Sequence, residues 1–123
     1  MTEGRRAKRV GDLIRANLVE LLNREIDDPG LAAIVITDVQ VPDDLATAWV
    51  QVRLMVGDDD ARARLRAVRA LKRSASRLRR RLAPRLELRR VPELRFSYDD
   101  GHDKTRRVEA ILEEIELERK NEE

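Results

Sequence analysis

The side chains of this sequence that could do chemistry are mainly arginines and lysines, and half of them lie in one segment. Residues 61–90 contain thirteen basic side chains and one acid, Glu87, whereas the other ninety-three residues contain thirteen basic and twenty-three acidic side chains. The net charge of +2 is therefore the sum of +12 in this segment and −10 elsewhere. Because guanidinium groups bind phosphate with paired hydrogen bonds, the segment predicts a surface that binds a polyanion.

Two interpretations of these charges are open. The segment is either a solvated amphipathic helix or a phosphate-binding surface, and the near absence of acids favours the second, because solvated faces usually mix signs. A smaller basic group, Arg5, Arg6, Lys8 and Arg9, lies where a first helix is predicted to begin and where the helix dipole disfavours cations. It is either a frayed, solvated terminus or a second contact with the same anion.

Other site chemistry is weakly supported. His102 is the only histidine, and it falls in a predicted loop where solvation explains it best. The acidic groups at residues 58–60 and at Asp99, Asp100 and Asp103 could hold a divalent ion, but helix caps and turns explain them more simply. No Ser-His-Asp set can be assembled, and the five glycines are too scattered for a phosphate loop. We therefore expect no catalysis, no metal and no cofactor.

The composition indicates one soluble domain. A chain of 123 residues without cysteine excludes disulfides, and no run of about eighteen apolar residues could span a membrane. The first ten residues, MTEGRRAKRV, have no apolar segment after their positive charges, so we expect no signal peptide and a cytoplasmic location.

The apolar pattern predicts the elements that position the basic segment. Residues 5–28 have the spacing of a helix. Residues 34–41 and 46–56 alternate as two strands of an antiparallel hairpin, with residues 35, 37, 39 and 41 on one face of the first strand and one buried face on the second. A third strand at 94–98, parallel to an earlier one, precedes a last helix at 104–119. The predicted core residues are Val10, Leu13, Leu18, Val50, Val52, Leu71, Leu78, Leu82 and Phe96.

The basic segment itself predicts a helix with one apolar stripe, formed by Leu65, Val68, Leu71, Ala75, Leu78 and Leu82. The aspartates at 58–60 supply an N-cap, and Pro84 is expected to end the helix. Ser74, Ala75 and Ser76 form its weakest point, because serine can bend a helix. A bend there would give two helices around one core.

The same sequence offers little for reading bases. Three aromatic residues cannot supply the stacking platforms of base-reading sheets, and no four-residue loop is bounded by glycines. Binding is therefore expected to use phosphates and the shape of a folded RNA or duplex.

The predicted order of helix, strand, strand, helix, helix and strand is that of a type II KH domain, and the chain resembles the ribosome-binding factor A family. The resemblance is carried by residues 9–31, 36–52, 71–82 and 89–103, most specifically by ITDVQVPDDLATAWV and VPELRFSYDD. The family replaces the KH glycine loop by an interhelical kink, typically Ala-x-Gly. The matching positions are Ser74, Ala75 and Ser76, with serine in place of glycine.

The resemblance implies an α+β, KH-like domain over residues 1–112, with a three-stranded mixed sheet, and an acidic tail over 113–123 that is helical or frayed. It implies a monomeric assembly factor that binds the free small (30S) ribosomal subunit. Such a factor assists late maturation and 5′-end processing of 16S rRNA, matters most in the cold, and has no membrane or small-molecule partner. The alternatives are a module that docks an acidic protein and an architectural DNA-binding protein.

With this resemblance, the basic side chains become candidate contacts to ribosomal RNA. Not all can face the RNA, because Arg79, Arg80 and Arg81 together span most of a helical turn. Those on the side away from Leu78 and Leu82 are the better candidates. The full set is Lys72, Arg73, Arg77, Arg79, Arg80, Arg81, Arg85, Arg89 and Arg90, helped by Arg5, Arg6, Lys8 and Arg9.

Overall fold

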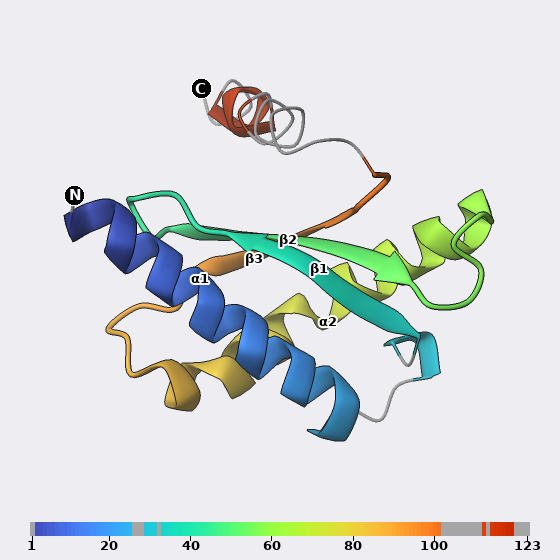
Figure 1. Cartoon of the computed structure of the whole chain (residues 1–123), viewed down its shortest axis with the longest axis horizontal. Helices are drawn as coiled ribbons and strands as arrows, with labels where there is room; N and C mark the ends of the chain where they lie inside the picture. Colours follow the sequence, from blue (N-terminus) through green and yellow to red (C-terminus); the bar gives the residue numbers. More distant parts are fainter. Residues whose placement is uncertain (1, 26–28, 32, 102–111, 113, 120–123) are drawn as a thin grey trace.

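The computed structural model describes residues 2–25, 29–31, 33–101, 112 and 114–119, arranged as two helices packed on one face of a sheet (Figure 1). Residue 112 and residues 114–119 are also helical and lie over the opposite face (Figure 1). The elements in chain order are α1 (Thr2–Glu20), the π-helical turn η1 (Leu21–Glu25), the 3-10 turn η2 (Pro29–Leu31), β1 (Ile34–Gln40), β2 (Thr47–Leu54), α2 (Ala61–Leu86) and β3 (Glu93–Tyr98).

The sheet has the order β1-β2-β3 and is mixed. β1 and β2 pair antiparallel, with Gln40 opposite Trp49, and β2 and β3 pair parallel, with Val50 opposite Phe96. A parallel pair needs a long crossover, and α2 is that crossover. The predicted hairpin, the parallel third strand and the α+β class are confirmed.

The core lies between the sheet and the two helices, and Leu18, Val50, Leu71, Leu78 and Leu82 are among its buried residues. All predicted core residues are buried except one. Leu13 is 41% exposed, so its prediction is wrong. The buried row of α1 passes through Val10, Ile14 and Leu18, and Leu13 is displaced from Ile14 by about 100° around the helix. Leu65 was predicted to belong to the apolar stripe of α2, but it is 50% exposed. Like Leu13, it is displaced around its helix from the buried residues.

A β-bulge changes which residues of β1 face the core. The pairing register shifts between Ile36 and Asp38, so one extra residue is inserted at Thr37. Before the bulge Ile34 and Ile36 are buried and Val35 is 41% exposed, whereas after it Val39 packs against the core. The prediction that Val35 and Val39 share a face is wrong, because it assumed an uninterrupted period of two and a bulge reverses that alternation.

β2 is buried on both faces rather than on one. Trp49 and Gln51, on the face opposite Val50, are 3% and 8% exposed. The Gln51 amide donates to the Ser97 hydroxyl at 2.6 Å, which satisfies a polar group in this central strand. On the same side of the sheet, Arg95 pairs with Glu118 of the segment 114–119 at 3.1 Å. The predicted strand was also too long, since Val56 lies beyond β2 and is 77% exposed.

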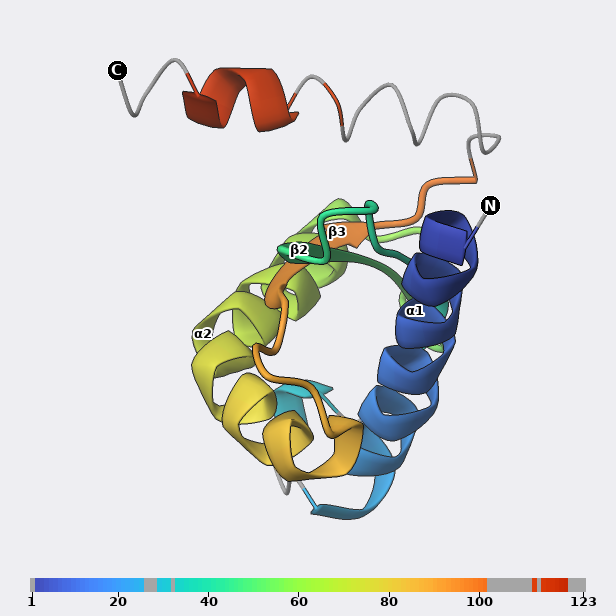
Figure 2. The same cartoon turned by 90° about the vertical axis from the view of Figure 1, so that its left-hand side faces the viewer.

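α2 is a single helix of 26 residues. α2 runs through Ser74, Ala75 and Ser76 without interruption, so these residues do not divide it into two separate helices. The helix curves around the core (Figure 2), and a bend located at these three residues stays a prediction. Asp60 is the predicted N-cap, and its carboxylate accepts hydrogen bonds from the N–H groups of Arg62 and Ala63.

The far end of α2 also differs from the prediction. The helix continues past Pro84 to Leu86 and ends at Glu87, which adopts a left-handed conformation with φ of 51°. Pro84 lies in the last turn, where it removes an N–H donor and its ring crowds the carbonyl one turn earlier. The two residues after it continue the helix, and Leu86 reaches the core, where it is 5% exposed.

Some predictions fall on residues outside the described ranges. These are the end of the first helix at residues 26–28, the loop containing His102 and Asp103, and the first part of the last helix from 104 to 111.

Candidate nucleic-acid interface

The outer face of α2 carries one continuous line of exposed guanidinium groups. Its members follow one another at steps of three or four residues and therefore share a face of the helix. We call this set the arginine row: Arg62, Arg66, Arg69, Arg73, Arg77 and Arg80. From first to last it extends about 27 Å at about 1.5 Å per residue.

The arginine row has no acidic partner in the described part of the chain. The ion pairs found there involve other cations, such as Arg24, Arg53, Arg85 and Arg95. Within the row, the contact from the Arg77 guanidinium to the Ser74 hydroxyl is weak, at 3.5 Å. Unneutralised, exposed guanidinium groups in a line can bind successive charges of a polyanion.

The sequence prediction covers only half of the row. Arg73, Arg77 and Arg80 were predicted, whereas Arg62, Arg66 and Arg69 were not. The spacing of three and four residues continues unchanged toward the helix N-terminus, so the missing signal was in the sequence. The prediction was centred on the expected kink and therefore stopped at Lys72.

Two of the predicted contacts also bind groups of the protein itself. The Nε and Nη2 atoms of Arg79 donate to the carbonyl oxygen of Val91, at 3.1 and 2.6 Å. Arg85 pairs with Glu20 of α1 at 3.5 Å, and its side chain is 25% exposed. Arg79 thus holds the segment after α2 against the helix, and Arg85 joins α2 to α1.

The remaining predicted cations on and after α2 are exposed but lie off the row. Lys72 is about 100° around the helix from Arg73 and lines a hollow with Glu93 and Glu114. Arg81 faces the other side, and Arg89 and Arg90 follow the helix.

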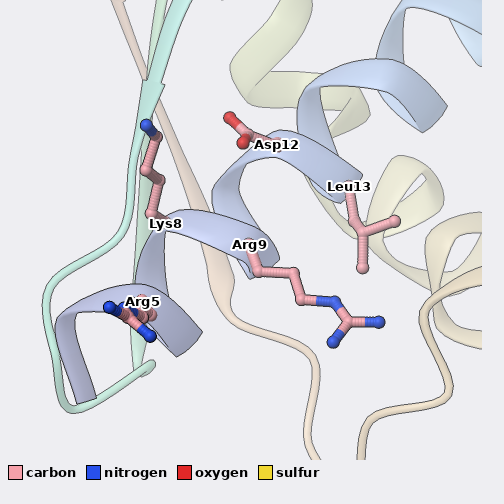
Figure 3. Close-up of a pocket in the computed structure, with 5 residues that line it drawn as sticks. All are labelled: Arg5, Lys8, Arg9, Asp12 and Leu13. Atoms are coloured by element: carbon pink, nitrogen blue, oxygen red, sulfur yellow. The ribbon is translucent and has the colours of Figure 1, made fainter. Parts of the chain in front are cut away.

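The basic turns of α1 form a separate group. Arg5, Lys8 and Arg9 line a shallow hollow together with Asp12 and Leu13 (Figure 3), and Arg6 is exposed nearby. In Figure 2 the N-terminal turns of α1 lie at the right and the middle of α2 at the left, and the two helices approach each other only toward their C-terminal ends. The structure therefore does not bring this group onto the face of the arginine row.

The start of α2 is anchored by a cluster around Asp58. The Asp58 carboxylate pairs with the Arg53 guanidinium at 2.5 Å and accepts a short hydrogen bond from the Tyr98 hydroxyl. That hydroxyl accepts the Leu54 N–H at 3.0 Å, and the Arg64 guanidinium lies 4.8 Å from the centre of the Tyr98 ring. The cluster thus ties the ends of β2 and β3 to the first turn of α2.

The electrostatics of this cluster agree with its geometry. The hydrogen bond from Arg53, followed by that from Tyr98, lowers the pKa of Asp58 to about 2. Burial and then the hydrogen bond to Asp58 raise the pKa of Tyr98. Arg53 and Arg64 are therefore engaged in positioning α2, unlike the arginines of the row.

Two kinds of feature are absent from the described residues. None of the helices there is long and apolar enough to cross a membrane. Likewise, within those residues, no group of three or more acids or histidines has an arrangement that could hold a metal ion.

A mixed three-stranded sheet with a basic crossover helix defines a KH-like domain, and likeness to solved structures confirms this fold. The crystal structure of ribosome-binding factor A from Thermus thermophilus superposes with a TM-score of 0.62 and 26% identity, over 75% of this chain and 94% of that one. A solution structure of a Thermotoga maritima protein, described as a putative ribosome binding factor A, has a TM-score of 0.56 and 22% identity, over 81% of this chain and 89% of that one.

Sequence comparison identifies the family. The family model described as ribosome-binding factor A matches residues 6–112, so the chain belongs to the ribosome-binding factor A family. The ribosome-binding factor A of Sorangium cellulosum (strain So ce56) is 43% identical over 111 residues, 90% of this chain and 89% of that protein. That of Alkalilimnicola ehrlichii is 38% identical over 109 residues, 89% of this chain and 82% of the relative.

Proposed function

We propose that the protein binds the free small (30S) ribosomal subunit through the phosphates of its RNA and assists late maturation and 5′-end processing of 16S rRNA. Membership of the ribosome-binding factor A family supports ribosome binding. The observation that carries the proposal is the arginine row, six exposed guanidinium groups on one face without an acidic partner among the described residues. The protein acts as a monomer in the cytoplasm, without catalysis or cofactor, and leaves before translation.

The chemistry of the row favours a phosphate backbone as the ligand. Each guanidinium can donate two parallel hydrogen bonds to a phosphate, and a rigid helix presents them at fixed spacing. The chain has three aromatic residues in all, so base stacking contributes little. The contacts therefore give affinity and orientation, and recognition of the correct particle depends on the shape of the folded RNA.

The test is a triple variant of the row, Arg73→Ala, Arg77→Ala and Arg80→Ala, measured for binding to purified small subunits over a range of salt. Each lost phosphate contact should reduce the steepness of the log–log salt dependence by roughly 0.7–0.9, so three should reduce it by about 2–3. We expect affinity at physiological salt to fall roughly tenfold or more.

A matched control removes the same charge elsewhere. Arg15→Ala, Arg24→Ala and Arg119→Ala are also exposed positions but lie off α2. The control should keep both the affinity and the salt dependence. A folded row variant that binds small subunits like the unmodified protein would exclude the row as the RNA surface. Binding to duplex DNA, or to an acidic protein, in preference to small subunits would overturn the proposed function itself.

A further inference from the structure

A groove lies beside the arginine row along the N-terminal half of α2. Its volume is about 460 Å³, within the range of roughly 300–1,000 Å³ that is usual for ligand sites. One wall is basic and the other is apolar. The lining residues are Arg66, Arg69 and Arg73 on the basic wall, Ala63, Ala67 and Ala70 on the floor, and Leu54, Val56 and Gly30 on the opposite wall.

The floor of the groove permits close approach to the helix. Ala63, Ala67 and Ala70 follow at steps of four and three residues, so they form one edge of α2. An alanine has no atoms beyond Cβ, and any longer side chain there would occupy the groove. A ligand can therefore lie close to the helix backbone, beside Arg66, Arg69 and Arg73, which also line the groove.

The opposite wall contains an apolar side chain that the described part of the protein leaves uncovered. Val56 is 77% exposed, although it comes shortly after β2, whose residues are largely buried. Gly57 has φ of 86°, a conformation that costs little for glycine. That turn leads the chain away from β2 and leaves Val56 beside the groove rather than in the core.

We propose that this groove binds an unpaired stretch of RNA, with phosphates on Arg66, Arg69 and Arg73 and a ribose or base against Val56. The inference rests on the proposed function and adds a site to it. A single strand has one charged edge and one edge of exposed, weakly polar bases, which matches a groove with one basic and one apolar wall. A duplex buries its bases in the stack, so it could use the arginines but would gain nothing from Val56.

The experiment compares a labelled oligouridylate of about ten nucleotides with a blunt-ended RNA duplex that carries the same number of phosphates, by fluorescence anisotropy. Val56→Asn removes the apolar wall without changing charge. Ala63→Gln fills the groove, also without changing charge. Each should weaken oligouridylate binding roughly fivefold and leave duplex binding and the salt dependence unchanged. Arg66→Ala with Arg69→Ala should instead weaken both ligands and reduce the salt slope for the oligouridylate by about 1.4.

The matched control is Val35→Asn, because Val35 is also an exposed valine, at 41%, and lies on β1 outside the groove. Circular dichroism and thermal unfolding confirm that each variant is folded. Unchanged oligouridylate binding by Val56→Asn and Ala63→Gln would overturn the groove proposal. The proposal would also be overturned if polyglutamate competed for the groove as effectively as RNA does. That result would indicate an acidic protein segment as the occupant.

The experiments distinguish a missing groove site from a missing ribosome contact. If the groove variants bind oligouridylate normally while the Arg73, Arg77 and Arg80 variant loses small subunits, the groove proposal fails and the proposed function stands. If the unmodified protein binds neither oligouridylate nor small subunits, both fail.

Discussion

The two long faces of α2 have different roles. The inner face places Leu71, Leu78 and Leu82, each 0% exposed, against the sheet and α1. The outer face places the arginine row in solvent. Arginines near the boundary between these faces, such as Arg79 and Arg85, find a carbonyl or a carboxylate within reach and become part of the fold. From this comparison we expect nearby acceptors, rather than the number of arginines, to decide which of them are available to a partner.

The largest effect is expected on the inner face. Leu78→Ala should lower the free energy of unfolding by about 2–5 kcal/mol, because it removes buried methyl groups and leaves a cavity. Its neighbour Arg77→Ala should change the same quantity by less than about 0.5 kcal/mol, since surface alanines are tolerated and favour helix. Urea unfolding measures both. Equal losses of stability in the two variants would mean that the two faces are not separate.

A smaller effect is expected at the boundary, where Arg79 and Arg80 form a matched pair of adjacent arginines. Arg79→Ala removes two hydrogen bonds to the Val91 carbonyl and should cost about 1 kcal/mol in stability. Arg80→Ala should leave stability unchanged and weaken RNA binding. Thermal unfolding and small-subunit binding of the two variants test this assignment, and the opposite pattern would place Arg79 in the interface and Arg80 in the fold.

The smallest effect is expected at the half-buried Asp58 cluster, and it should depend on pH. The folded pKa of Asp58 is about 2, below its ordinary value of 3.8, so its ionised form is favoured by folding. Its contribution to stability is therefore present above about pH 4 and is lost as the pH falls toward 2. Asp58→Asn should unfold more easily at neutral pH and show a flatter stability profile between pH 4 and 2. Asp59→Asn, which removes the same charge one residue away, should retain the steeper profile.

Most elements of the fold and much of its core were predictable from the sequence, and the errors have specific causes. Periodicity located β1, β2, β3 and α2, but periodicity cannot reveal where it is interrupted. Because the bulge at Thr37 was not foreseen, Val35 was predicted on the wrong face of β1. Leu13 was predicted in the core, but it lies beside the buried row of α1. Pro84 was expected to end α2, but the helix continues through it to Leu86, which is buried in the core.

The candidate site was less predictable than the fold. The regular spacing of the arginine row is visible in the sequence, and its C-terminal half, Arg73, Arg77 and Arg80, was predicted from the charge. The engagement of Arg79 depends on Val91, twelve positions away, and no local pattern signals it. The groove combines Gly30, Val56 and Ala63, which come from three segments that meet only after folding. Sites assembled by tertiary packing leave no periodic signal in the sequence.

The parallel pairing of β2 with β3 has a consequence for the order of folding. Gln51 and Ser97, which bond across this pair, are 46 positions apart, so closing the sheet costs loop entropy before any contact repays it. The contacts of the hairpin and within α2 are local, and we expect them to form earlier. A chain emerging from synthesis would then display the whole arginine row before the last strand arrives. Synthesis from the N-terminus and the local contacts of the hairpin and α2 both favour folding of these elements before β3 joins the sheet.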